Sequence, residues 1–513
     1  MGYETWSELD VSPGATEGEP DARRRGQAAS GSGTKPFPPL AALRLVSPVV
    51  LLAVAILLAA LLRAPIETIF AHVPINYDEG WNAFHAQRLM AGGPLYPPIS
   101  PGTFLNYPPL SFYVVGLLGK AIGDYVFAGR LLALLSLFVV AGNVGFITRT
   151  LGVMPQLALL ASLTFLVFVV LFYPDYVAMD DPQWFGHALQ TSGLVLLVRR
   201  HALTTPRLVA VALLMAAGGL VKQDLVALPL AVTAWLLLVD HRAFWRWLAI
   251  GAAIVAVSLG TLILLHGRDF ISQVLLSERN FSTQTLFNIV HLFALRLAAY
   301  VAFAVVAIVV AARDRRMWLF GIYFGLATGL GFAMITAVGV IYSALFDMTI
   351  AMMICAAVCM QWIAGLLAEL RRGRYLGSAV VAVLLVLPMR GGIAGGFYYR
   401  QQLENALAAA PQWQATLNRL ATAPGPVACE SLALCYWAGR SSSIDFFNFG
   451  QYILRHPAFG TPTISAIADG RLAMIQMDYP DGSIRFSDAL NNLVTTHYGP
   501  AQTAPTALLM PRR

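Results

Sequence analysis

Two pairs of adjacent carboxylates are the residues whose types and spacing are most suggestive of chemistry. Asp78 and Glu79 stand in NYDEGWNAFHAQ, and Asp180 and Asp181 stand in YVAMDDPQWFG. Adjacent carboxylates repel each other, so each pair is expected to be compensated by a cation, a metal or a substrate. A carboxylate can also be the general base that takes the proton from an attacking hydroxyl group.

Helix capping is a simpler interpretation of each pair taken alone. A carboxylate at the start of a helix accepts hydrogen bonds from the first backbone N–H groups and complements the helix dipole. Pro182, directly after the second pair, suits an early helical position. A shared catalytic site makes a further demand, because it requires both pairs to reach the same face of the protein.

The composition is that of an integral membrane protein. Of the 513 residues, 58% are hydrophobic and only 12% are charged, which a soluble domain of this length would not tolerate on its surface. This predicts an all-α polytopic bundle of about eleven transmembrane helices. The candidate spans are 45–62, 129–148, 154–173, 184–199, 206–221, 225–239, 247–265, 289–312, 317–338, 343–367 and 376–396.

The net charge of +7 comes from arginines in short clusters between apolar runs, and not along one basic face. This pattern indicates topology determinants and no nucleic-acid partner. With the N-terminal tail in the cytoplasm, every later cluster falls on the same side, and both acidic pairs fall on the extracytoplasmic side. The clusters are Arg23–Arg25, Arg149, Arg199, Arg200 and Arg207, Arg242 and Arg246, Arg313, Arg315 and Arg316, and Arg371, Arg372 and Arg374.

This topology requires that the segment 108–123 does not cross the membrane. Its uninterrupted apolar core, Leu110 to Gly119, is too short for about 30 Å of hydrocarbon, and Lys120 interrupts it. We expect the segment to lie in the interface or to re-enter.

Three parts of the chain follow from these patterns. Residues 1–40 are predicted to form a disordered cytoplasmic tail. Residues 41–396 are predicted to form the membrane domain, with an extracytoplasmic loop at 63–128. Residues 397–513 predict a small extracytoplasmic α/β domain with a strand at 472–478. Cys429 and Cys435 lie in that domain, where a disulfide bond and two free thiols are both open.

Several of these motifs, in this order, resemble the GT-C superfamily of membrane glycosyltransferases. They are the acidic pair after the first span, Arg88 farther along the same helix, Tyr107–Leu110 (YPPL), Arg130 opening the next span, and the second acidic loop. The likeness is closest to the branch with protein O-mannosyltransferases and lipid A aminoarabinose transferases, and it covers roughly residues 45–240.

The resemblance implies inverting transfer of a sugar from a polyprenyl-phosphate donor to a hydroxyl acceptor on a glycan, lipid or protein. The reaction would take place at the outer face of a bacterial inner membrane, with Asp78 as the general base. Glu79 would support Asp78 or bind the acceptor. Asp180 and Asp181 would orient the acceptor or hold a divalent cation, Mg or Mn.

The donor phosphate would meet Arg88 and Lys222. Lys222 lies at the outer end of the fifth predicted span, where an unpaired ammonium near lipid is costly, although it could instead snorkel to the headgroups. In the aminoarabinose branch a lysine precedes the proline pair, whereas Tyr107 stands here. Lys222 or Arg279 is therefore expected to replace that lysine, and Tyr107 remains a candidate substrate contact.

Three further side chains are candidates. His85 lies seven residues after Asp78 and could join a metal site, although a surface or interface histidine is the alternative. His187 stands in the same relation to Asp180. Asp347, near the outer start of the tenth predicted span, could contact the sugar or pair with an arginine.

The alternative function is a membrane transporter or lipid-linked sugar flippase. Transporters place charges at the bilayer midplane, often beside broken helices in repeated halves. This chain concentrates its acids at one predicted face and shows no repeat, so its sequence favours a glycosyltransferase.

Overall fold

The computed structural model describes residues 48–199, 202–340, 342–368, 384, 389–478 and 488–512. The predicted tail 1–40, Arg200 and the cluster Arg371–Arg374 lie outside the described residues, as does most of the predicted span 376–396.

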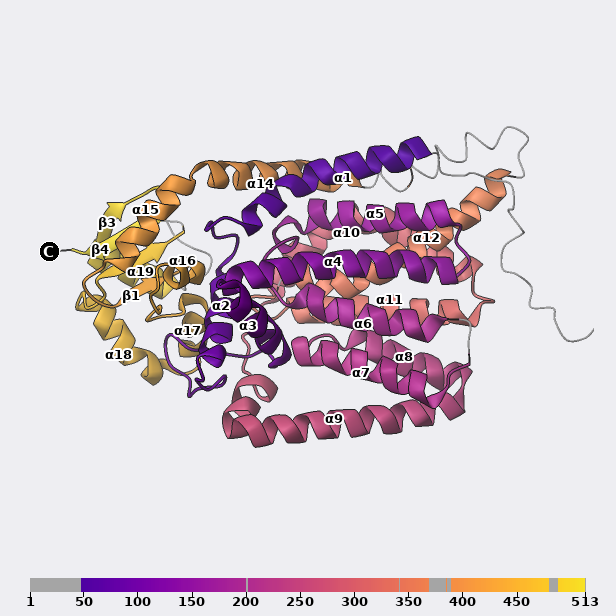
Figure 1. The fold of residues 1–513 in the computed structure, drawn as a ribbon, viewed down its shortest axis with the longest axis horizontal. Helices are drawn as coiled ribbons and strands as arrows, with labels where there is room; N and C mark the ends of the chain where they lie inside the picture. The colour runs from indigo at the N-terminus through magenta and orange to yellow at the C-terminus, as the bar shows by residue number, and fades with distance from the viewer. Residues whose placement is uncertain are drawn as a thin grey trace, which may run out of the picture. The chain divides into compact units, whose positions relative to one another are not determined.

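A bundle of helices running side by side forms the larger part of the molecule (Figure 1). Ten helices of the described part coincide with ten of the predicted spans. They are α1 (Pro48–Ile69), α4 (Tyr125–Thr150), α5 (Pro155–Phe172), α6 (Gln183–Val198), α7 (Thr205–Val221), α8 (Ala227–Val239), α9 (His241–Phe270), α10 (Thr283–Val310), α11 (Arg315–Ile335) and α12 (Phe346–Ala368).

Six of the described helices, α1, α4, α5, α9, α11 and α12, are long and apolar enough to cross a membrane. Shorter apolar helices, among them α7 and α8, complete the bundle. These helices are those of a multi-pass membrane protein. The number of about eleven spans stays a prediction. The helix α9 lies at the edge of the bundle (Figure 1), and its Leu264 and Leu265 are 88% and 66% exposed. Such an apolar face belongs against lipid.

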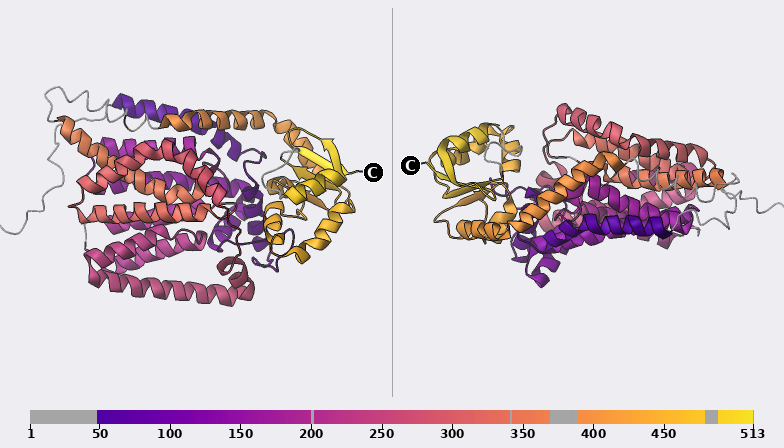
Figure 2. Two further views of the ribbon diagram at one scale, coloured as in Figure 1. Left: turned by 180° about the vertical axis from the view of Figure 1, so that it is seen from behind. Right: turned by 90° about the horizontal axis from the view of Figure 1, so that it is seen from above.

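Two short helices, α2 (Tyr77–Met90) and α3 (Leu110–Ile122), lie together at one end of the bundle, next to the C-terminal part of the chain (Figures 1 and 2). We call this the site end. The 13 residues of α3 span only about 20 Å as a helix, and α3 packs against α2 and α4. This placement agrees with the prediction that segment 108–123 does not cross.

The arginine clusters of the described part gather at the other end of the bundle. Arg316, at the start of α11, donates to the carbonyl of Thr150 at the end of α4, at 2.7 Å. Arg246 of α9 donates to the carbonyl of Leu203, before α7, at 3.0 Å. The clusters therefore share one end, as the positive-inside pattern requires.

The C-terminal part forms the predicted α/β domain, reached through α14 (Arg390–Ala408) and α15 (Ala410–Ala421). Its four-stranded sheet has the order β1-β2-β4-β3, with β1 and β2 parallel and the other pairs antiparallel. Cys429 and Cys435 form a disulfide bond, which decides between the two alternatives left open by the sequence. The elements are β1 (Val427–Cys429), α16 (Leu432–Trp437), α17 (Phe446–Ile453), α18 (Pro457–Ala468), β2 (Met474–Met477), α19 (Asp488–His497), β3 (Tyr498–Gln502) and β4 (Ala507–Pro511).

The C-terminal domain rests directly on α2. The helix α16 packs against α2, and a Cβ at Gly80 would overlap the backbone nitrogen of Ala433. The hydroxyl of Tyr436 accepts a hydrogen bond from the backbone N–H of Tyr125, at the start of α4, at 2.9 Å. The absence of a side chain at Gly80 thus lets the domain touch the helix that carries the first acidic pair.

We predict that the site end faces outward. Lys120, in the last turn of α3, and Arg313, between α10 and α11, are both exposed and lie at opposite ends of the bundle. A cysteine at Lys120 should therefore react with an impermeant maleimide added to intact cells, and a cysteine at Arg313 should react only after permeabilisation. The native background is low, because Cys355 and Cys359 are buried and the other two cysteines are bridged. The reverse labelling pattern would overturn the orientation.

Candidate functional site

A buried ion pair between Arg130 of α4 and Glu79 of α2 organises the site end. The guanidinium contacts both carboxylate oxygens, from Nε to Oε1 at 2.7 Å and from Nη2 to Oε2 at 2.9 Å. Both side chains are almost completely shielded from solvent. A bidentate pair of this kind combines charge attraction with a fixed orientation.

Arg130 also holds the chain that leads from α1 to α2. Its Nη1 donates to the carbonyls of Thr68 and Ala71 at 2.6 and 2.9 Å, and its Nη2 donates to the carbonyl of Val73 at 2.6 Å. With the two bonds to Glu79, all five N–H donors of the guanidinium are used. This fixes the entry of the chain into α2, and with it Asp78.

The second acidic pair is attached to the same ion pair. The backbone N–H of Asp180 donates to Glu79 Oε1 at 3.2 Å, and Asn82 Nδ2 donates to the carbonyl of Asp180 at 2.6 Å. The loop between α5 and α6 is therefore bound to α2. The two acidic pairs, 101 residues apart in the chain, meet at one end of the bundle, as a shared site requires.

The carboxyl group of Asp180 lies against α4 and is buried. A Cβ at Gly129 would overlap it, so this glycine makes the space. Burial, and then the nearby charges of Glu79 and Asp181, raise the pKa of Asp180 well above its usual value. Asp180 therefore belongs to the packed interface between α2, α4 and the loop before α6.

Asp78 and Asp181, the other members of the two pairs, line a cavity of about 400 Å³, which we call the main cavity. Its charged and polar lining comes from α2, from the segment before α3, from the loops after α5, α7, α9 and α11, and from α17. The wall from α11 is apolar, with Leu330, Ala333 and Met334. The polar lining comprises Tyr77, Asp78, Asn106, Tyr107, Tyr176, Asp181, Lys222, Gln223, Asp224, Arg279, Ser343 and Asn448.

Lys222 is the buried cation of the main cavity. It caps the C-terminus of α7, and its Nζ lies 3.7 Å from Asp181 Oδ2 and 4.9 Å from the centre of the Tyr107 ring. Burial alone would lower the pKa of Lys222, but Asp181, Tyr107 and Asp224 outweigh it and raise the pKa. Lys222 is therefore a permanent positive charge, and the predicted alternative of snorkelling to headgroups does not describe its position.

The lining of the main cavity includes five of the sequence-predicted residues: Asp78, Asp181, Lys222, Arg279 and Tyr107. The other predicted site residues, Glu79, Arg88, Asp180, His85 and Asp347, lie outside this lining. Glu79 forms a buried ion pair with Arg130, and Arg88 lies in the last turn of α2, outside this lining. Asp347 accepts a hydrogen bond from the hydroxyl of Tyr323 at 2.5 Å and lies 3.7 Å from Nδ1 of His187, so it belongs to a buried network between α6, α11 and α12.

Asp180, Asp181 and His85, the side chains predicted as metal ligands, each contact other parts of the protein. The ring nitrogen Nε2 of His85 lies 3.1 Å from the carbonyl of Phe104, and burial lowers the pKa of His85 to about 3. The carboxyl group of Asp180 lies against Gly129, and Asp181 Oδ1 accepts a hydrogen bond from the backbone N–H of Gln183 at 2.7 Å. Within the described ranges, no group of three or more His, Cys, Asp and Glu side chains is placed to hold a metal.

The sequence did not point to several residues of the main cavity. Asp224 could have been predicted from the sequence, because it stands two positions after Lys222 in the same turn. No sequence pattern indicated Phe447 and Asn448 of α17, because they belong to the C-terminal domain, far along the chain from the other cavity residues. The ring of Phe447 lies 5.3 Å, centre to centre, from that of Tyr77, directly before Asp78.

Comparisons with known proteins bear on this architecture. No family model and no curated protein sequence matches the chain. The crystal structure of ArnT from Cupriavidus metallidurans in the apo state aligns with a TM-score of 0.59 and 16% identity, over 90% of this chain and 97% of that one. The crystal structure of the same protein bound to undecaprenyl phosphate aligns with a TM-score of 0.58 and 14% identity, over 88% and 97%.

The chain has the ArnT fold. This confirms the GT-C architecture expected from the acidic motifs, and it extends the likeness from residues 45–240 to almost the whole chain. At this level of identity the similarity concerns the fold. The chemistry of the ArnT-like bundle must therefore be argued from its own residues.

We predict that Gly129→Ala destabilises this ArnT-like bundle, because the added methyl group would overlap the Asp180 carboxyl group. Overpacking of this kind costs about 1–3 kcal/mol. Gly142→Ala, on the same helix, is the matched control, since a Cβ there meets no atom within 4 Å. Melting temperatures of the purified proteins should fall for the first variant only, and an equal effect of both would contradict this role of Gly129.

We also predict that Arg130→Ala is strongly destabilising, because it leaves Glu79 charged, buried and unpaired. Breaking one partner of a buried pair typically costs about 3–5 kcal/mol. Equilibrium unfolding in mixed micelles measures the loss. Arg63→Ala removes the exposed pair with Glu67, whose side chains are 70% and 47% exposed, and should change stability little. Similar losses in both variants would refute the central role of Arg130.

Proposed function

We propose that the chain is a membrane glycosyltransferase that takes its sugar from a polyprenyl-phosphate donor. The observation that carries this proposal is the composition of the main cavity. Carboxylates, Asp78 and Asp181, face cations, Lys222 and Arg279, beside an apolar wall from α11. Such a cavity suits a ligand with a charged phosphate joined to a long hydrocarbon chain.

The two halves of the donor match the two kinds of wall. Lys222 and Arg279 supply the positive charge that a phosphodiester requires, and Leu330, Ala333 and Met334 supply contacts for isoprenoid carbons. The proposal also has support from the comparison, because one of the ArnT structures with this fold is bound to undecaprenyl phosphate.

Asp78 is the proposed general base. Its carboxylate takes the proton from the acceptor hydroxyl as the oxygen forms a bond to the anomeric carbon of the sugar. The bond between that carbon and the phosphate oxygen breaks on the opposite side, which inverts the configuration. Its electron pair stays on the polyprenyl phosphate, whose growing negative charge is stabilised by Lys222 and Arg279.

Asp181 has a positioning role in this scheme. Its Oδ2 lies 3.7 Å from Lys222 Nζ, while its Oδ1 accepts from the backbone of Gln183. The carboxylate is thus fixed to the start of α6 and holds the ammonium at the cavity. We place the reaction at the outer face of the membrane, following the charge pattern of the helices.

Donor binding and catalysis can be separated by two variants. The protein in lipid nanodiscs should bind radiolabelled undecaprenyl phosphate, and Lys222→Met/Asp181→Asn, which removes both charges of the pair, should weaken this binding about ten-fold or more. Asp78→Asn should bind it normally but should release the sugar of a polyprenyl-phosphate donor at least about a hundred-fold more slowly. Lys120→Met, outside the cavity, is the control, and size-exclusion profiles check folding.

Two results would contradict the proposal. If the wild type and the charge-pair variant bound undecaprenyl phosphate equally, the donor site would not be in the main cavity. If the wild type and Asp78→Asn consumed the donor at equal rates, Asp78 would not be the general base. Movement of a lipid-linked sugar across vesicles without its consumption would instead support the flippase alternative.

A further inference from the structure

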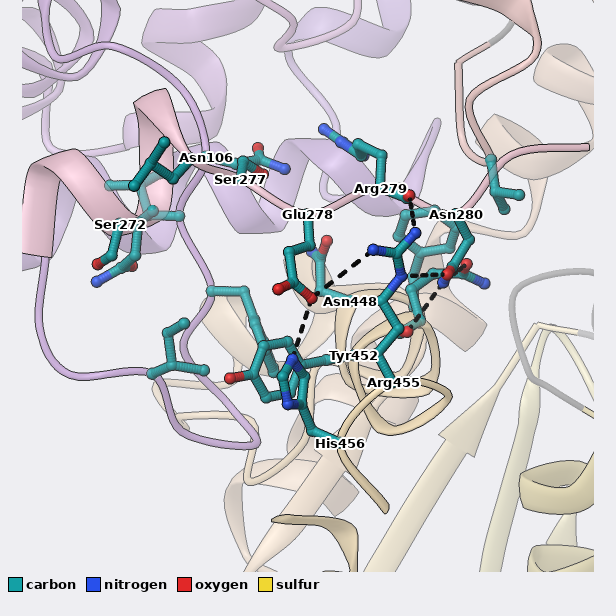
Figure 3. A pocket seen from close by; sticks show the side chains of 18 residues that line it. Asn106, Ser272, Ser277, Glu278, Arg279, Asn280, Asn448, Tyr452, Arg455 and His456 are labelled. Carbon is teal, nitrogen blue, oxygen red and sulfur yellow. Dashed lines mark hydrogen bonds and ion pairs between the residues drawn. The ribbon is translucent and has the colours of Figure 1, made fainter. Parts of the chain in front are cut away.

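A second cavity, of about 320 Å³, lies between the loop after α9 and the helix α17 of the C-terminal domain (Figure 3). We call it the second cavity. Amide and hydroxyl side chains make up much of its lining, among them Asn106, Ser272, Gln273, Ser277, Asn448 and Gln451. Neither the fold comparison nor the proposed chemistry of the main cavity assigns it a ligand.

The second cavity adjoins the main cavity. Asn106, Arg279, Phe447 and Asn448 line both. Phe447 is held between Tyr77, at 5.3 Å between ring centres, and Gly339, which has a φ of +87° and where a Cβ would overlap the Phe447 ring. A ligand in the second cavity is therefore separated by one aromatic side chain from the cavity that contains Asp78.

The charged residues around the second cavity are largely engaged with one another. Glu278 lies between His456, 3.0 Å from its Nε2, and Arg455, 4.0 Å from its Nη1 (Figure 3). Arg455 also donates to the carbonyl of Arg279 at 2.6 Å and to Asn280 Oδ1 at 2.9 Å. These contacts bind the loop after α9 to the turn between α17 and α18, at one side of the second cavity.

Gln273 provides an independent sign of a ligand. It is only 5% exposed, and its Nε2 donates to the carbonyl of Pro97 at 2.6 Å. Its Oε1 has no hydrogen-bond partner among the described residues, although buried acceptors are almost always satisfied. A hydroxyl group entering the second cavity would supply the missing donor.

We infer that the second cavity binds the acceptor, and that the acceptor presents a sugar there. This rests on the proposed function, and it names the acceptor class that the proposal leaves open. Amides and hydroxyls match the alternating donors and acceptors of a polyhydroxylated ring. An acyl chain in the second cavity would leave Gln273 Oε1 without a hydrogen-bond donor. Asn106, Arg279 and Asn448 line both cavities, so an acceptor bound in the second cavity lies next to the cavity that contains Asp78.

Saturation-transfer NMR with methyl glycosides of common hexoses and pentoses tests this inference on the whole protein in nanodiscs. At least one glycoside should give a signal. Gln273→Met and Gln451→Met should each weaken its binding about ten-fold, because each removes amide hydrogen bonds. Gln414→Met, on an exposed face of α15, should bind like the wild type. Two separate variants keep the test informative if one of them misfolds.

Three results would overturn the inference: no signal from any glycoside, a signal unchanged in both cavity variants, or a signal only from a serine-containing peptide, which would favour a protein acceptor. The binding of undecaprenyl phosphate by the wild type separates a failure of this inference from a failure of the proposed donor. If sugar binding persists while the wild type fails to bind undecaprenyl phosphate, the proposed donor is wrong and the sugar site remains.

Discussion

The ion pair of Arg130 with Glu79 is the constraint on which the site end depends. A guanidinium with five satisfied donors is stable in a buried position only if every acceptor stays in place. The acceptors come from the end of α1, the chain that follows it and α2, and Glu79 in turn accepts from the backbone of Asp180. Four separate segments of the chain are thus fixed around one charge.

This arrangement divides each acidic pair between two tasks. Glu79 and Asp180 turn toward the packed interior, where Glu79 is paired with Arg130 and Asp180 lies against Gly129. Asp78 and Asp181 line the main cavity. Successive residues of a helix point about 100° apart, so adjacent acids at the start of α2 necessarily face different surroundings. The capping and catalytic interpretations of the pairs are therefore compatible, since different members carry them. The N-terminus of α2 has a capping box formed by Asn76 and Glu79.

The sequence was sufficient for the parts of the site that depend on long-range patterns. Apolar lengths located the helices, and charge bias predicted that residues 78–79 and 180–181 share one face. The sequence was insufficient where the direction in which a side chain points from its helix decides whether it lines the cavity. Arg88 is ten residues after Asp78, about 80° from it around a helix and some 15 Å along it, so it does not line the main cavity. No local pattern linked Phe447 to Tyr77, because their contact joins the C-terminal domain to α2.

The C-terminal domain is best understood as a wall of the site. It touches α2 through Ala433 at Gly80, it supplies Phe447 and Asn448 to both cavities, and its Arg455 holds the backbone of Arg279. Arg279 is one of the two proposed phosphate contacts, so a displacement of α17 would move a cation of the donor site as well as the boundary between the cavities. A sugar bound in the second cavity would also lie against Arg279 itself, because Arg279 lines both cavities.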